Sequence, residues 1–325
     1  MATTQLSRPK ESFRGVRPLN LSRDTAQVVR LLNLVFGPTI EQEGQRLLDG
    51  SMVFNSTISF MNRLNQLTHG ASPGFVWEEE KRVIGNVSLV GSPVAGRYLI
   101  ANVAVHPDYR RRGIALSLME AALQAVKQKR GRTVLLQVRD DNQGAIQLYQ
   151  TLGFHTLGTM SSWHTSVAQL SDLPIPPNGP PIRPLRGTEW ETAIQLDRTH
   201  CHPDLDWPVP LPYEFYKTGF FRWFYDFVNG RQRETWATTR QGKLLGLAQI
   251  TSEFGYPHML RIRIHPEWRA ELTRPLLAKL IRRLSYMRYR SVTLEHPADD
   301  ENMNPLLRQT GFRIVRTLST MKVDV

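Results

Sequence analysis

Tyr98–Ala115 reads YLIANVAVHPDYRRRGIA, a mostly apolar run followed by a basic turn and a glycine. The apolar part, Tyr98–Val105, has the length and composition that predict a buried strand. Pro107 marks the loop that follows it. Apolar residues at helical spacing from Ile114 to about Lys129 predict an amphipathic helix. The stretch therefore predicts a strand, a loop and a helix in immediate succession.

The basic turn of this stretch, Arg110–Gly113, lies where the predicted helix begins. A helix N-terminus presents unpaired backbone N–H groups and the positive end of the helix dipole, so it binds phosphate readily. Gly113 has no side chain that would keep a pyrophosphate from the backbone, and Arg110, Arg111 and Arg112 add charge and forked donors. We predict a phosphate site here; the alternative is a solvated basic turn.

Further elements are predicted on both sides of this unit. They are an early helix, two strands of a hairpin, another strand and a short helix, at Val28–Val35, Gly74–Glu79, Arg82–Val90, Thr133–Val138 and Asn142–Thr151. The short helix would be capped by Asp140, Asp141 or Asn142 and ended by Gly153. Strands mixed with helices predict an α/β or α+β layered domain, with a mixed central sheet flanked by helices.

The chain contains two similar halves, separated by the proline-rich segment Ser171–Pro181. Five prolines and a glycine in eleven residues cannot continue a helix or a central strand, so this segment is predicted to be an extended linker. Three landmarks recur in the same order, 158 to 166 residues apart: Val16–Leu19 with Ile182–Leu185, Val105–Arg110 with Ile264–Arg269, and Thr151–Phe154 with Gln309–Phe312. Such repetition predicts a duplicated domain.

These patterns divide the chain into four parts. We expect a disordered lead-in at 1–12, a first domain at 13–170, the linker at 171–181 and a second domain at 182–325. Each half is long enough to bury its own core.

The composition of the chain narrows its class. There are 325 residues with a net charge of +12, and the excess is +7 up to residue 170 and +5 beyond it. This charge suits either nucleic acid or a phosphorylated small molecule. With a single cysteine, Cys201, there is no intramolecular disulfide and no cysteine-based zinc cluster, which fits a cytoplasmic protein. We expect neither a membrane-spanning helix, since no apolar run is long enough, nor a signal peptide, since residues 1–12 are polar.

Two motifs of the first half resemble the GCN5-related N-acetyltransferase (GNAT) family. Arg110-Arg111-Arg112-Gly113-Ile114-Ala115 matches that family's pyrophosphate loop, and Asn142 followed by Tyr149 and Gly153-Phe154 matches its second signature. The resemblance covers roughly residues 14–168, with weaker traces beyond. It implies an acyltransferase that uses acetyl-CoA, or another acyl-CoA, without a metal. The chain is accordingly predicted to be a tandem member of the family.

The resemblance also implies roles for single positions. Val103, Ala104 and Val105 would pair with the pantetheine arm through their backbone, and the main chain from Arg110 to Ala115 would hold the pyrophosphate. Asn142 would touch the cofactor near the thioester. Tyr149 would lie near the sulfur and protonate the leaving thiolate; the alternative for Tyr149 is a ring that only packs in the core.

A base for the attacking amine is harder to assign. The buried strand Leu99–Val105 holds no carboxylate. Glu78, Glu79 and Glu80 near the hairpin turn could form an acidic entrance for a cationic substrate, but a solvated turn is the simpler interpretation of such a charge run. His106 is another candidate, but its counterpart His265 occurs in the second half too, which indicates a structural role.

The second half lacks the key residues of both motifs. Arg110–Ala115 corresponds to Arg269–Arg274, so Leu272 replaces the glycine, and Leu307 replaces Tyr149. We expect a degenerate GNAT-like domain without catalysis.

Two other features of this half are ambiguous. Ten aromatic residues between Trp207 and Phe227, with Tyr216, Phe220, Trp223, Phe224 and Phe227 on one helix face, fit a core helix or an acceptor wall. His200–Asp204 resembles a metal site only superficially.

The predicted function is therefore transfer of an acetyl group to an amine on a small molecule or a peptide. A non-catalytic acyl-CoA sensor or scaffold is the alternative, and nucleic-acid binding rests on charge alone. Retention on coenzyme A at high salt would distinguish cofactor binding from general polyanion binding. The acceptor and the oligomeric state are not encoded in any recognisable motif.

Overall fold

The elements of the first half follow the predicted order. The computed structural model describes the chain apart from residues 1–12, 48–73, 175–178, 209, 220–223 and 225, so the predicted lead-in lies outside the described residues. In chain order the elements are β1 (Arg14–Pro18), α1 (Leu21–Leu47), β2 (Phe75–Glu79), β3 (Arg82–Gly91), β4 (Arg97–Val105), α3 (Ile114–Gln128), β5 (Thr133–Arg139), α4 (Gln143–Thr151) and β6 (His155–Ser166).

The second half repeats this order. Its elements are β7 (Ile182–Pro184), α5 (Trp190–His200), β8 (Arg231–Arg240), β9 (Lys243–Glu253), β10 (His258–Ile264), α7 (Arg269–Leu284), β11 (Ser291–Pro297), α8 (Met303–Gln309) and β12 (Arg313–Asp324). The predicted helix face that includes Phe220 and Trp223 lies partly outside the described residues, and Phe224 and Phe227 are exposed.

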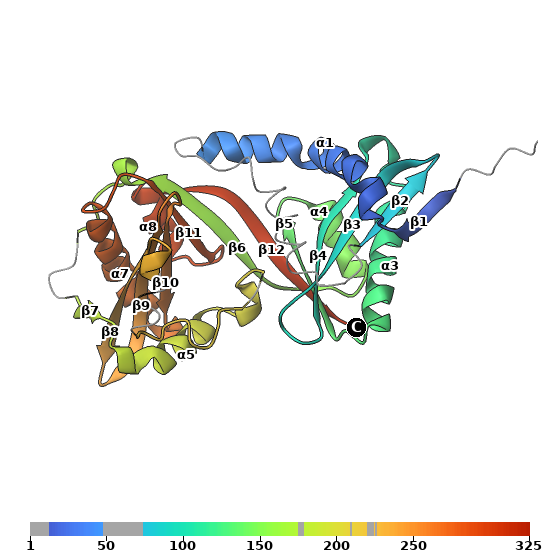
Figure 1. Ribbon diagram of the computed structural model, residues 1–325. Coiled ribbons are helices and arrows are strands. Elements are labelled where there is room, and N and C mark those ends of the chain that lie inside the picture. The colour runs from blue at the N-terminus through green and yellow to red at the C-terminus, as the bar shows by residue number, and fades with distance from the viewer. Residues whose placement is uncertain (1–12, 48–73, 175–178, 209, 220–223, 225) are drawn as a thin grey trace, which may run out of the picture.

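One sheet of twelve strands joins the two halves, in the order β1-β2-β3-β4-β5-β12-β6-β11-β10-β9-β8-β7. Most neighbours are antiparallel, but β4 pairs in parallel with β5, and β10 pairs in parallel with β11. Figure 1 shows β6 and β12 as two long strands that cross the middle of the molecule between the halves. The predicted mixed sheet with flanking helices is confirmed, but it is continuous across the linker.

The two halves exchange their last strands. β12, at the C-terminus, pairs with β5 of the first half, from Leu318 opposite Arg139 to Asp324 opposite Thr133. In return, β6 pairs with β11 of the second half, and β6 and β12 also pair with each other. The expectation that each half buries its own core is therefore wrong in this respect, because each core is completed by a strand from the other half.

Helices cover both faces of the sheet. In the first half, α3 buries Leu118, Met119 and Ala122 against one face, where Met321 of β12 joins the same core. α1 covers the opposite face with Val28, Leu31 and Leu32. In the second half, α7 packs on the face that is equivalent to the α3 face and α5 on the other.

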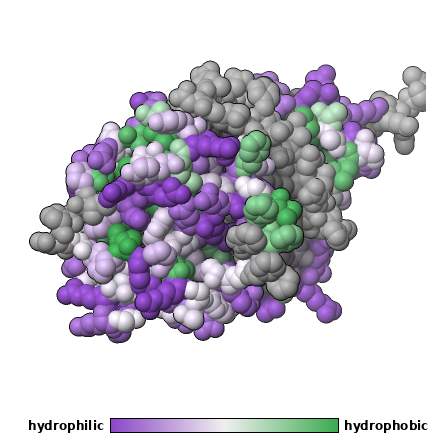
Figure 2. Space-filling model, turned by 60° about the vertical axis from the view of Figure 1, so that its left-hand side comes forward, coloured by the Kyte–Doolittle hydropathy of each residue, from purple (hydrophilic) through white to green (hydrophobic). Residues whose placement is uncertain are grey.

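One face of the second half is mostly polar (Figure 2). Figure 2 shows hydrophilic residues over much of the face that comes forward there, with hydrophobic residues in separate patches. None of the helices in the described part of the chain is both long and apolar enough to cross a membrane.

Candidate active site

A gap opens between β4 and β5 in the first half. The two strands pair in parallel from Arg97 opposite Thr133 to Ile100 opposite Leu136, and the pairing ends there. β4 nevertheless continues to Val105 and β5 to Arg139. Val103, Ala104 and Val105, predicted to pair with a pantetheine arm, lie in this unpaired stretch. A gap between strands offers backbone hydrogen bonds to an extended ligand.

A β-bulge in β4 accounts for this divergence. Asn86 of β3 faces Ala104 and Ser88 faces Ala101, so one residue of β3 opposes two of β4, Asn102 and Val103. Asn102 has a left-handed backbone with φ of 53°. A bulge bends its strand and strengthens the local twist, and bulges are common next to active sites. Sequence reasoning missed this bulge; its one signal was an asparagine inside an apolar strand.

The predicted phosphate loop follows directly. After the short 3₁₀ turn Pro107–Tyr109, Arg111 and Gly113 both have left-handed backbones, with φ of 62° and 75°. α3 begins at Ile114, and its N-cap Gly113 supplies no side-chain hydrogen bond. A Cβ atom placed on Gly113 would meet no heavy atom within 4 Å. The first turn of α3 therefore presents its N–H groups to open space, as an anion site requires.

The arginine side chains brace this loop. Arg112 donates a hydrogen bond of 3.0 Å to the carbonyl oxygen of Asp108, and its guanidinium lies 4.8 Å from the centre of the Tyr109 ring. Arg110 reaches the carbonyl oxygen of Val105 at 3.4 Å. All three arginines are exposed. They thus raise the local positive potential at the start of α3 while two of them hold the loop in shape.

Tyr149 lies on α4 among the core residues under the gap. It is 6% exposed, its ring centre is 6.0 Å from that of Phe154, and Val103 and Val105 pack against the same cluster. Burial raises the pKa of Tyr149 to about 12. The hydroxyl therefore keeps its proton at neutral pH, as a general acid must.

Asn142 caps α4, which decides among the three predicted caps. Its Oδ1 accepts a hydrogen bond of 3.2 Å from the N–H of Ala145. The residue is exposed, and its amide NH₂ lies at the surface where α4 begins. Gly153, with φ of 85°, follows the end of the helix as predicted.

The three glutamates do not form the predicted acidic entrance. Glu78 is buried and lies 2.5 Å from Arg17 and 2.7 Å from Arg23, so two guanidinium groups neutralise its carboxylate. Glu79, which follows it on the strand, pairs instead with Arg14 at 3.3 Å. Glu80 has left-handed backbone in the turn. Consecutive strand residues point to opposite faces, which is why the carboxylates do not converge.

The network around Glu78 anchors α1 instead. Arg17 also binds Asp24 in the first turn of α1 through two hydrogen bonds of 2.6 and 2.9 Å. These hydrogen bonds hold the pKa of Asp24 well below its usual range. His106 is likewise structural in its contacts, since its Nδ1 accepts from the N–H of Asp108 at 3.4 Å.

The second half has neither the loop nor the bulge. α7 begins at Arg269, the counterpart of Arg110, so the counterpart of the phosphate loop is the first turn of a helix. Leu272, in the place of Gly113, is 2% exposed and part of the core, and Leu307, in the place of Tyr149, is fully buried. β10 pairs with β9 without a register shift from Met259 to Ile264.

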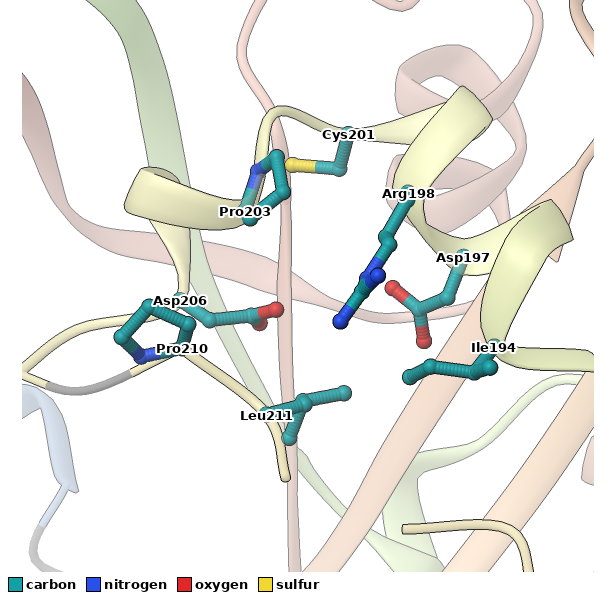
Figure 3. Close-up of a pocket in the computed structure, with 8 residues that line it drawn as sticks. All are labelled: Ile194, Asp197, Arg198, Cys201, Pro203, Asp206, Pro210 and Leu211. Carbon is teal, nitrogen blue, oxygen red and sulfur yellow. The ribbon is translucent and has the colours of Figure 1, made fainter. Parts of the chain in front are cut away.

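Charged side chains fill the corresponding region of the second half. Arg263 donates to Asp197 at 2.8 Å, and Arg261 bridges Asp197 and Asp206. Beside them lies a cavity of about 20 Å³, toward which Arg198 and Asp206 point in Figure 3. Such a volume holds about one water molecule, which is far less than a substrate needs.

The histidines near α5 are held by the backbone. Nδ1 of His200 lies 3.0 Å from the N–H of Ile264, and burial lowers the pKa of His200 to about 3. His202 accepts from the N–H of Asp204 at 3.2 Å. Within the described residues, no group of three or more His, Cys, Asp or Glu side chains could hold a metal ion.

Comparison with known proteins agrees with this geometry. Residues 43–154 match the model of the acetyltransferase (GNAT) family. The first half of the chain is a GNAT domain. The matched segment includes the bulged β4, the glycine loop and Tyr149.

Curated relatives of this GNAT domain share short segments with it. The [ribosomal protein bS18]-alanine N-acetyltransferase of Escherichia coli K12 is 41% identical over 54 residues, 17% of this chain and 36% of that protein. The peptidyl-lysine N-acetyltransferase YiaC of the same strain is 40% identical over 81 residues, 25% of this chain and 49% of that protein. The chain thus spans about a third to a half of the length of these relatives.

Solved structures match the whole chain in fold. A GCN5-related N-acetyltransferase from Sphaerobacter thermophilus has a TM-score of 0.58 at 13% identity, covering 98% of this chain and 97% of that one. A tandem GNAT protein from the clavulanic acid biosynthesis pathway has a TM-score of 0.51 at 16% identity, covering 96% and 98%. These likenesses show that the second half also has a GNAT fold.

Proposed function

We propose that this chain transfers an acetyl group from acetyl-CoA to an amine at a single site in the first half. One observation carries the proposal: a left-handed glycine at the uncapped N-terminus of α3, with open space in front of it, beside the gap between β4 and β5. A phosphate-bearing ligand with an extended arm fits that arrangement.

Different residues of the site would hold different parts of such a ligand. The N–H groups of the Arg110–Ala115 segment would hold the pyrophosphate, with Arg110, Arg111 and Arg112 around it. The backbone of Val103–Val105 would pair with the pantetheine arm, and Asn142 would contact the ligand from the start of α4. Acetyl-CoA would supply the acyl group as a thioester, and no metal is needed for this chemistry.

Tyr149 would donate its proton to the departing thiolate. With a phenol pKa of about 12 and a free thiol near 8.5, the transfer is uphill by about 5 kcal/mol. The same burial would also raise the pKa of the thiol, which narrows this difference. The attacking amine must arrive neutral. Because β4 carries no carboxylate from Arg97 to Val105, we propose that the amine gives its proton to water.

The acceptor is proposed to be a peptide or small-molecule amine. Its class is supported by the two relatives whose names give an alanine of a ribosomal protein and a peptidyl-lysine as acceptors. The degenerate second half is proposed to be non-catalytic, on the grounds of Leu272, Leu307 and the straight β10. We propose a cytoplasmic location, which the single cysteine suits.

Calorimetric titration of acetyl-CoA into the wild type and into Gly113→Glu tests the proposal. One site per chain that disappears in the variant is expected, since a glutamate there would repel phosphate and strain the turn. Gly242→Glu is the matched control, because Gly242 has φ of 76° and no heavy atom within 4 Å of its would-be Cβ, in a turn of the second half. Binding without turnover of any amine would favour the acyl-CoA sensor, and no binding at all would refute both.

A further inference from the structure

A buried polar cluster holds the bulge of β4. Asn86 is completely buried and Ser88 is 4% exposed, and both lie on β3, which pairs with β2 on one side and β4 on the other. Nδ2 of Asn86 donates a hydrogen bond of 2.9 Å to the carbonyl oxygen of Asn102, and Nδ2 of Asn102 donates to Oγ of Ser88 at 3.2 Å. The side chains of β3 therefore fix the left-handed residue of β4.

Asn86 is an unfavourable residue for this position. Because only its Nδ2 can donate to Asn102, the amide orientation is fixed, and Oδ1 is left buried without a hydrogen-bond partner among the described residues. An unsatisfied buried acceptor costs about 1–3 kcal/mol. An apolar residue of similar size would avoid this cost only where the neighbouring strand has no bulge, because at the bulge it would take the donor from the carbonyl oxygen of Asn102. The asparagine therefore belongs with the bulge.

The second half supplies the comparison. Leu247 of β9 stands opposite Arg263, as Asn86 stands opposite Ala104, and Leu247 is 1% exposed. The strand that pairs with β9 at this point, β10, has no bulge. The half with leucine has no bulge, no glycine loop and no tyrosine, whereas the half with asparagine has all three.

The hydrogen bond to Asn102 also orients the next N–H group. In a planar trans peptide the C=O of Asn102 and the N–H of Val103 point in opposite directions. Since the carbonyl turns toward Asn86 on β3, the N–H of Val103 turns toward the β5 side, where the gap lies. Neither β3 nor β5 has a residue in register with Val103.

We propose that Asn86 is a positioning residue that aims the N–H of Val103 at the thioester carbonyl of the bound acyl donor. This rests on the proposed function. The N–H would donate to the oxyanion that forms when the amine attacks, and Asn86 would act on it only through the Asn102–Val103 peptide.

Asn86→Leu and Asn86→Asp test this role. In the leucine variant we expect kcat to fall about 100-fold, the loss typical of one oxyanion donor, with the Kd of coenzyme A within about twofold of wild type. In the aspartate variant, the ionised carboxylate cannot donate to Asn102, but the protonated acid can. Its kcat relative to wild type should therefore rise as the pH falls from 8 to 6. Unchanged kcat in Asn86→Leu, or a flat ratio in Asn86→Asp, would overturn the proposal.

Gln249→Leu is the matched control for burial. Gln249 lies at the equivalent of Ser88, is 3% exposed and loses a hydrogen bond of 2.8 Å to Thr235 in the variant. Its kcat should match wild type. A purely structural role for Asn86 would instead lower the melting temperature and weaken coenzyme A binding in step with kcat. A wild type that binds no acetyl-CoA would overturn the proposed function together with this inference.

Discussion

The two halves of this chain share strand order and helix placement but differ around the fourth strand of each half and the loop after it. In the first half β4 bulges at Asn102, a left-handed Gly113 closes the loop, and α3 starts with unpaired N–H groups. In the second half β10 is straight and α7 starts one turn earlier, at Arg269. The fold therefore survives without the site, because the site depends on a few backbone conformations rather than on the core.

The second half replaces these features with internal contacts. Arg261 and Arg263 stand on β10 and share Asp197. Burial opposes ionisation of Asp197, but the charges of Arg263 and Arg261 hold its pKa below the usual value. The hydroxyl of Tyr216 donates a hydrogen bond of 2.5 Å to the same carboxylate. These ion pairs neutralise the buried charges of the second half, which indicates that the charged residues have a structural role.

The largest effect is expected from removing β12. A chain that ends at Gly311 leaves β5 and β6 without the strand between them. Since typical domains are stable by only about 5–15 kcal/mol, we expect loss of folding in both halves, seen as loss of a cooperative thermal transition by circular dichroism. A truncated chain that still binds acetyl-CoA would show that the first half folds independently.

Asp197→Asn should destabilise the protein through the second half without changing the site in the first half. Removing one partner of a buried ion pair costs about 3–5 kcal/mol, because the charges of Arg261 and Arg263 are left uncompensated. The free energy of unfolding should fall by that amount in urea titration. The acetyl-CoA affinity of the folded protein should not change. Asp172→Asn, at an exposed position in the linker, controls for the loss of one charge.

Tyr149→Phe removes the phenol hydroxyl, which is also missing at the equivalent position of the second half, Leu307. We expect kcat to fall about 100-fold through loss of the proton donor, while the Kd of acetyl-CoA stays the same. Steady-state rates with a suitable amine measure the first quantity and calorimetry the second. Tyr289→Phe, at a tyrosine that is 79% exposed, is the control. A wild-type rate in Tyr149→Phe would be evidence that the ring only packs.

The pH dependence of the reaction rate is the smallest expected effect, but it tests most directly whether Tyr149 is the acid. Its raised pKa of about 12 means that the phenol stays protonated up to pH 10. The rate should therefore rise with pH until the amine acceptor is neutral and then level off, without a falling limb below pH 10. A decrease between pH 8 and pH 10 would contradict Tyr149 as the acid, provided that circular dichroism shows the protein still folded.

The local units were predictable from the amino-acid sequence alone. They are the strand, basic loop and helix from Tyr98 to about Lys129, the capped helix before Gly153 and the duplication, because each depends on residues close together or on simple repetition. The phosphate-loop glycine was found this way, and its left-handed backbone agrees with it. The loss of that loop in the second half was also predictable, from Leu272 alone.

Tertiary contacts set the partners of these units. β6 pairs with β11 and β12 pairs with β5, so the exchange depends on contacts between residues about 125 to 191 positions apart. The same holds for Glu78. The sequence does not show that Arg17 and Arg23 pair with its carboxylate and make it unavailable to a cationic substrate. The bulge at Asn102 required the pairing register with Asn86, since backbone conformation at a single residue depends on the neighbouring strand as much as on its own side chain.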